Sequence, residues 1–149
     1  MSVGSDAGAP RDVAAGPPTL VVLVGHGETA SHLLAAARRI SPGGLDDVLA
    51  VNAGEGDCAA LELALASACG TRPHEERLFL VDVFGSSPWR RCAGLGVKGP
   101  ETVVVGGLSL AMLLKLASLD RGEAPAKSIG EACVASARRA TLMDGTCKE

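Results

Sequence analysis

The chain has 149 residues, a length typical of one domain with a buried core. Aromatic residues make up only 2% of it, and its formal net charge at pH 7 is -3. Proteins that bind nucleic acids are usually basic and often stack bases on aromatic side chains. This composition therefore argues against nucleic acid as a partner.

The cysteines and the apolar runs bear on the cellular compartment. The five cysteines have no C-x-x-C spacing, which argues against a zinc site or a disulfide framework and favours reduced thiols in a cytoplasmic protein. No apolar run is long enough to cross a bilayer, so we expect no direct membrane insertion. Residues 1–18 are rich in Gly, Ala and Pro and lack the pattern of a signal peptide, so we expect a disordered lead there.

Apolar runs alternate with segments of helical spacing from residue 19 onward. The runs that we expect to form strands are 19–25, 47–51, 77–84 and 101–107. The segments that we expect to form helices are 29–40, 57–69, 87–95, 108–119 and 128–142. This alternation predicts an α/β fold, a single doubly wound domain with a mostly parallel sheet of four to five strands and helices on both faces. We expect the domain to span residues 19–143 and a tail to span 144–149.

Polar residues mark three of the helix starts. Asp57 and Ser87 are placed to cap the second and third helices, with Pro88 in the favoured first helical position of the third. Ser128 and Glu131 have the spacing of a capping box at the start of the last helix.

Chemistry-bearing residues follow the expected strands where each strand ends. His26 follows the first strand within the sequence GHGETA, and Asp82 follows the third, ahead of the turn Gly85-Ser86-Ser87-Pro88. In doubly wound sheets ligands bind beyond the carboxyl ends of the strands. The sequence therefore predicts that a histidine, a carboxylate and a turn that opens a helix meet at one edge of the sheet.

The sequence GHGETA resembles two familiar motifs, but a residue that each motif requires is replaced here. It fits the G-x-G-x-x-A pattern of a dinucleotide site, yet Asn52 replaces the acid expected at the end of the second strand. It also resembles the LVRHGET signature of histidine phosphatases, yet Gly25 replaces the arginine that would clamp a phosphoryl group. Neither His32 nor His74 is placed to serve as the second histidine of such a phosphatase.

A histidine that itself carries a phosphoryl group needs only what the sequence contains. A neutral imidazole accepts a phosphoryl group at pH 7, and a carboxylate on its other ring nitrogen fixes the tautomer. We therefore assign these two roles to His26 and Asp82. The free backbone N–H groups at the start of the helix opened by Ser87 and Pro88 would bind the phosphoryl oxygens. No metal and no cofactor are needed.

The three segments VVLVGHGETASHLLAAA, FLVDVFGSSPWRRCA and VVVGGLSLAMLLKLASL resemble landmarks of the mannose-type enzyme IIA domain of the bacterial sugar phosphotransferase system. The resemblance runs from about Leu20 to Leu119. It implies that His26 is the phosphorylated histidine and Asp82 its supporting aspartate. It also implies that Gly85, Ser86 and Ser87 bind the phosphoryl group. Ser86 stands where the family has a second glycine, and Arg90 where it has an asparagine.

The resemblance implies a cytoplasmic phosphotransferase with a phosphohistidine intermediate. His26 would accept a phosphoryl group from the phosphocarrier HPr and pass it to a IIB component of a sugar permease. The family usually forms homodimers, in part by exchanging a strand near the C-terminus, but residues 120–128 have no strand signal. A regulatory protein that reports phosphorylation state, without feeding transport, is the alternative that the sequence leaves open.

Overall fold

The computed structural model describes residues 18–73 and 75–145. Its centre is a parallel sheet of four strands, β1 (Leu20–Gly25), β2 (Leu49–Asn52), β3 (Arg77–Val81) and β4 (Thr102–Gly106). Their order across the sheet is β2-β1-β3-β4, and every neighbouring pair is parallel. The predicted fold class is confirmed, with four strands in the described part of the chain.

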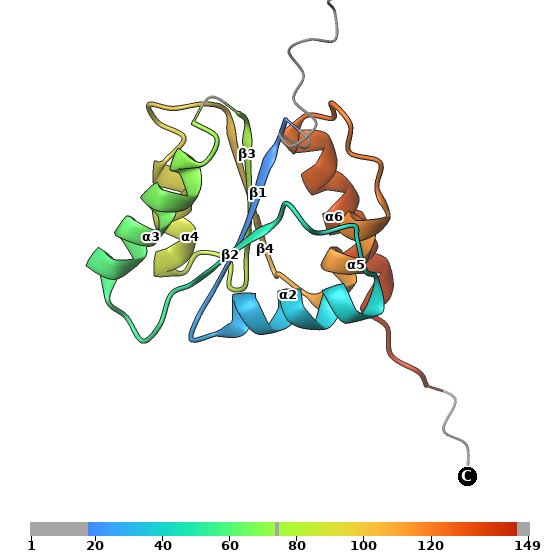
Figure 1. Cartoon of the computed structure of the whole chain (residues 1–149). Coiled ribbons are helices and arrows are strands. Elements are labelled where there is room, and N and C mark those ends of the chain that lie inside the picture. The colour runs from blue at the N-terminus through green and yellow to red at the C-terminus, as the bar shows by residue number, and fades with distance from the viewer. Residues whose placement is uncertain (1–17, 74, 146–149) are drawn as a thin grey trace, which may run out of the picture.

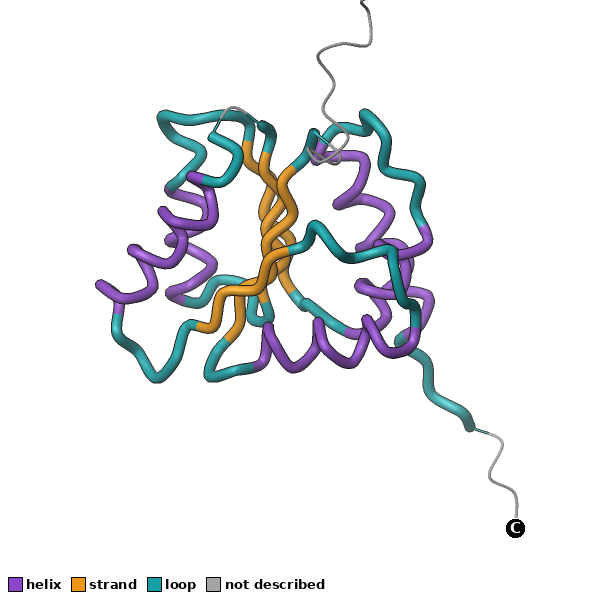
Figure 2. The backbone as a smooth tube through the Cα atoms, viewed as in Figure 1, coloured by secondary structure: helices purple, strands orange, loops and turns teal. Residues whose placement is uncertain are grey.

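Helices cover both faces of the sheet (Figure 1). One face carries α3 (Cys58–Gly70) and α4 (Ser87–Gly94). The other carries α2 (Thr29–Ile40), α5 (Leu110–Ser118) and α6 (Ala126–Ala140). The tube view in Figure 2 shows the sheet edge-on between these two layers of helices.

The two central strands are buried along their whole length. All six residues of β1 and all five of β3 are buried, whereas the edge strands β2 and β4 are mostly half-buried. Alternate residues point to opposite faces, so Val21 and Leu23 pack toward α2, α5 and α6, and Val22 and Val24 pack toward α3 and α4. Each such side chain contributes about 1.5–3 kcal/mol of hydrophobic free energy.

The helix starts agree only in part with the caps predicted from the sequence. Asp57 caps α3, since its side chain accepts a hydrogen bond from the backbone N–H of Ala60. Ser87 was the expected cap of α4, but the cap is Ser86, whose hydroxyl accepts from the N–H of Trp89 at 3.3 Å. Ser87 is instead the first helical residue and Pro88 the second.

The capping box predicted for the last helix is wrong. α6 begins at Ala126, two residues before Ser128, and its N-cap residue Pro125 makes no side-chain cap. The N–H of Ala126 donates instead to the carboxylate of Glu76, at 2.8 Å, just before β3. The first N–H of this helix is therefore capped by a residue that is distant in sequence.

The segments outside the sheet bear on three further expectations. Between α5 and α6 the described chain forms no strand, as the sequence predicts for this segment. No helix in residues 18–73 and 75–145 is long and apolar enough to cross a membrane. The predicted disordered lead, apart from residue 18, and the end of the tail from residue 146 lie outside the described residues.

Candidate functional site

The strand order brings the ends of β1 and β3 together at the centre of the sheet. β1 and β3 are neighbours, and the connection after β1 leads to β2 on one side of this pair, whereas the connection after β3 leads to β4 on the other side. Ligands of open α/β sheets bind at such a switch point. His26 is the first residue after β1 and Asp82 the first after β3. Both strands end at the lower edge of the sheet in Figure 1.

The side chains of His26 and Asp82 are in direct contact. The Nδ1 atom of His26 lies 3.0 Å from one carboxylate oxygen of Asp82 and 3.1 Å from the other. The backbone N–H of His26 also donates to the same carboxylate, at 2.8 Å. The imidazole is 53% exposed and the carboxylate only 14%, so a held carboxylate supports a ring that faces solvent. Because Nδ1 faces Asp82, Nε2 is the ring nitrogen that remains available.

Gly25 allows this close approach. A Cβ atom at this position would lie 3.0 Å from the Cβ of Thr29, 3.1 Å from the backbone N of Ala30 and 3.4 Å from the carboxylate of Asp82. Such contacts are tighter than a side chain tolerates without movement of its neighbours. A side chain at the position that an arginine occupies in the phosphatase signature would therefore crowd the start of α2.

Asn52, at the end of β2, makes contacts within the fold. Its side-chain oxygen accepts a hydrogen bond from the N–H of Ser31 at 3.1 Å, and its amide group donates to the Ser31 hydroxyl at 2.9 Å. These bonds tie β2 to the first turn of α2. Asn52 stands where a dinucleotide site requires an acid, and it has a structural role.

A small pocket of about 140 Å³ adjoins the imidazole. Pockets for small-molecule ligands are usually larger, about 300–1,000 Å³. The pocket walls come from the loop after β2, the start of α3 and the start of α4. The lining residues are His26, Ala53, Gly54, Gly56, Asp57, Cys58, Leu61, Ser87 and Pro88. Its volume suits a compact group attached to the histidine.

The three residues predicted to bind the phosphoryl group follow Asp82 closely, but only one of them lines the pocket beside His26. Gly85 adopts a φ of 78°, a left-handed conformation that glycine allows at low cost. The Ser86 hydroxyl donates to the carbonyl of Val83 at 2.7 Å in addition to its capping contact. Ser87 is exposed and lines the pocket beside His26, whereas Gly85 and Ser86 do not line it.

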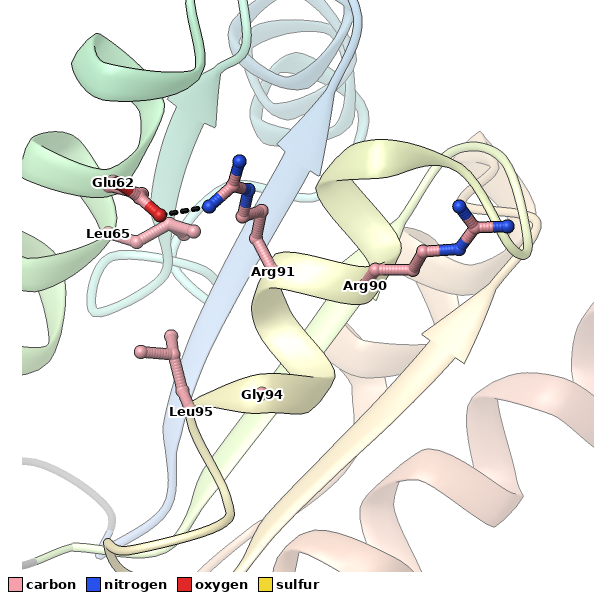
Figure 3. Close-up of a pocket in the computed structure, with 6 residues that line it drawn as sticks. All are labelled: Glu62, Leu65, Arg90, Arg91, Gly94 and Leu95. Atoms are coloured by element: carbon pink, nitrogen blue, oxygen red, sulfur yellow. Dashed lines mark hydrogen bonds and ion pairs between the residues drawn. The ribbon is translucent and has the colours of Figure 1, made fainter.

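Two neighbouring arginines on α4 point in different directions. Arg91 points toward Glu62 of α3 and forms an ion pair with it across a groove of about 440 Å³ (Figure 3). Arg90 extends the other way, away from Glu62, and is exposed. The groove therefore holds a surface ion pair and none of the predicted site residues.

His32 and the buried thiols of Cys92 and Cys133 lie outside the pocket beside His26. His32 and Glu28 form an exposed i,i+4 pair at 3.8 Å on α2, and His74 lies outside the described residues. Burial raises the pKa of Cys92 to about 12 and that of Cys133 to about 11, so both thiols stay protonated at neutral pH. Within the described residues no group of three or more His, Cys, Asp or Glu side chains could hold a metal ion.

The structure has an exposed apolar patch beside the site, formed by Val83 and Phe84, that was not predicted from the sequence. β3 ends at Val81, so Val83 and Phe84, predicted as part of the strand, lie in the following turn with exposed fractions of 51% and 74%. The Phe84 ring lies against that of Trp89, with centroids 4.4 Å apart. The strand prediction continued through these residues because apolar runs alone do not mark where a strand ends.

Solved structures support the fold. The chain is similar to the phosphotransferase system component EIIA of Streptococcus agalactiae, with a TM-score of 0.76 and 20% identity over 87% of this chain and 99% of that one. It is also similar to the mannose/sorbose specific IIA subunit of Enterococcus faecalis, with a TM-score of 0.74 and 21% identity over 88% of this chain and 98% of that one. At these identities the likeness establishes the fold alone.

A family assignment follows from the sequence as a whole. No curated protein matches the chain significantly. The model of the EIIA-man family, described as the fructose IIA component of the phosphotransferase system, matches residues 20–133. That range contains all the strands, the His26 loop and the Asp82 turn. The chain belongs to the EIIA-man family of phosphotransferase system IIA components.

Proposed function

We propose that this protein is a cytoplasmic phosphoryl carrier of the sugar phosphotransferase system. His26 accepts a phosphoryl group from phospho-HPr and passes it to a IIB component for sugar uptake. The observation that carries the proposal is the contact of the His26 Nδ1 with the Asp82 carboxylate, at 3.0 and 3.1 Å. This contact leaves Nε2 as the free nucleophilic nitrogen on an exposed ring.

The side chains of His26 and Asp82 have distinct roles in the transfer. Asp82 accepts a hydrogen bond from Nδ1–H, so the lone pair of the neutral ring is on Nε2. Nε2 attacks the phosphorus of the donor phosphohistidine, the new N–P bond forms and the N–P bond to the donor breaks. The positive charge that develops on the His26 ring faces the carboxylate, which stabilises it. In the next step the phosphoryl group leaves Nε2 for the IIB nucleophile and the neutral ring is restored.

The pocket supplies donors for the phosphoryl oxygens. Ser87 lines it with a hydroxyl group, and its backbone N–H is among the first of α4, where the helix dipole attracts anions. We assign direct phosphoryl binding to Ser87. Gly85 and Ser86 act by shaping the turn and capping the helix.

A protein donor fits this site better than a free sugar does. The pocket of about 140 Å³ has room for a phosphoryl group, and the half-exposed imidazole is within reach of a partner's surface. The exposed side chains of Val83 and Phe84 follow Asp82 directly and provide apolar contact area there.

We propose further that the carrier domain spans residues 19–143 and forms a homodimer. β4 is at one edge of the sheet, and within the described residues only β3 pairs with it. An unpaired strand edge is a template for a second chain.

Reconstitution tests the function. The protein is incubated with Enzyme I, HPr and labelled phosphoenolpyruvate, and the label is then examined for acid lability, which marks a phosphohistidine. We expect one acid-labile label on the wild type and none on His26→Gln, which keeps a polar side chain of similar length. His32→Gln is the matched control, since His32 is also exposed, and it should label normally. Label retained on His26→Gln, or absent from the wild type, would contradict the proposal.

A further inference from the structure

A second cavity lies at the opposite edge of the sheet from His26. It has a volume of about 410 Å³ and lies where β3 begins, beneath the loop that leads from α4 to β4. That loop is at the upper edge of the sheet in Figure 1. The residues that line the cavity are Arg77, Gly94, Leu95, Val97, Lys98 and Gly99. None of them is acidic, and two are cationic.

Arg77 carries a buried positive charge without an anionic partner. Its exposed fraction is 9%, and its side chain is on the face of the sheet that packs against α3 and α4. One contact to a protein acceptor is a long hydrogen bond from Nη1 to the carbonyl of Leu95, at 3.5 Å. The Nε atom is buried and has no hydrogen-bond partner. No ion pair joins Arg77 to a carboxylate within residues 18–73 and 75–145.

Arg121, another buried arginine, is paired with a carboxylate by comparison. Its exposed fraction is 6%, and its two terminal nitrogens donate to both carboxylate oxygens of Asp47, at 2.6 and 2.9 Å. One of them also donates to the carbonyl of Gly44, at 3.3 Å. This is how a fold usually compensates a buried guanidinium. Arg77 lacks such compensation, and because buried donors are nearly always paired, its free Nε–H calls for an explanation such as a bound anion.

The loop over Arg77 has the composition of an anion cradle. A Cβ atom at Gly99 would lie 3.3 Å from Nη1 of Arg77, so the absence of a side chain lets the loop backbone come close to the guanidinium. Lys98 and Gly99 are exposed, and Lys98 brings a second positive charge to the cavity wall. The cavity volume is within the usual range for small-molecule sites, about 300–1,000 Å³.

We propose that this cavity is a second ligand site, for a small molecule that carries a phosphate group. The forked guanidinium of Arg77 binds two phosphate oxygens and Lys98 neutralises the second charge of the dianion. Binding shifts the loop of residues 94–99 so that the buried Nε–H gains an acceptor. The site is separate from His26 and does not depend on the carrier function.

Nuclear magnetic resonance titration tests the proposal. The probes are inorganic phosphate and glucose 6-phosphate, with acetate as a carboxylate, glucose as a neutral sugar and sodium chloride at matched ionic strength. We expect saturable shifts of the Lys98 and Gly99 amides and of the Arg77 Nε–H with the two phosphates. The shifts should be weaker with acetate and absent with glucose or chloride. The same shifts in His26→Ala would separate this site from the carrier site.

Variants identify the residues that bind. Arg77→Met keeps the apolar stem and should weaken phosphate binding about 10- to 100-fold, the effect of losing a charged hydrogen-bond donor. Lys98→Gln, at an exposed position that leaves the fold intact, should weaken it several-fold, and the exposed Lys127→Gln should not change it. A wild type without saturable shifts, or unchanged binding in both cavity variants, would overturn the proposal and leave Arg77 a structural residue beneath the end of α4.

Discussion

Replacement of Asp82 by asparagine tests the mechanism at its centre. In the wild type one carboxylate oxygen accepts from both the backbone N–H and the Nδ1 of His26, and the second oxygen lies 3.1 Å from Nδ1. Asparagine has the same shape but one oxygen and no charge. If its oxygen keeps the shared position, its NH₂ group lies beside Nδ1–H, and two donors face each other. If the amide turns, Nδ1 becomes an acceptor and the proton moves to Nε2, the nitrogen that must attack.

Both orientations should slow phosphoryl transfer without unfolding the protein. Loss of the orienting aspartate in a buried triad lowers the rate about 10⁴-fold. The His26 ring is 53% exposed, so water can replace part of the lost stabilisation, and the donor is already an activated phosphohistidine. We therefore expect a loss of about 10- to 100-fold, as for other residues that orient a reacting histidine.

Rapid-quench measurement of His26 phosphorylation by phospho-HPr gives the rate directly. Glu28→Gln is the matched control, because it removes an equivalent charge from an exposed carboxylate two residues from His26, and its rate should stay within about twofold of wild type. Thermal unfolding followed by circular dichroism verifies that both variants fold. A wild-type rate in Asp82→Asn would refute the role assigned to the carboxylate.

Four further substitutions have distinct expected outcomes. Ser87→Ala should slow phosphorylation about two- to tenfold in the same assay and keep the fold, whereas Ser86→Ala should lower the free energy of unfolding by about 1 kcal/mol because it removes the α4 cap. Gly25→Ala should lower it by about 1–3 kcal/mol in urea titrations, since its Cβ has no room. Burial tends to raise the pKa of Asp47, but the hydrogen bonds and charge of Arg121 outweigh burial and lower it. This pair should therefore stabilise the fold fully above about pH 3.8 and less as the pH falls through the folded pKa, and Asp47→Asn should abolish that dependence in pH-dependent urea titrations.

The elements of the fold could be predicted because local patterns determine them. The strands are continuous apolar runs and the helices between them have helical spacing, so the alternation alone indicates a parallel sheet covered on both faces. The errors lie where the ends of elements depend on contacts distant in sequence. Glu76, which is distant in sequence, accepts the first N–H of α6. Val83 is exposed although it continues an apolar run.

The proximity of His26 and Asp82 could be predicted from the sequence for a related reason. His26 and Asp82 are 56 positions apart, but both follow buried strands, and parallel strands bring their carboxyl ends to one edge of the sheet. Which serine caps α4 depends on the φ and ψ angles of the turn, since Ser86 and Ser87 are equally good caps by residue type. The sequence could not distinguish them.

Arg77 could not have been identified from the sequence at all. An arginine at the start of a strand is usually exposed, and the rule for open α/β sheets directs attention to the carboxyl ends of the strands. Arg77 is at the amino end, where the turn from α4 to β4 closes over it. Burial of its charge is a property of the packed fold, and so is the lack of a carboxylate like the one that Asp47 provides for Arg121. Because the two edges of the sheet are built by different loops, the ligand proposed for Arg77 and the phosphoryl group proposed for His26 would not compete for the same space.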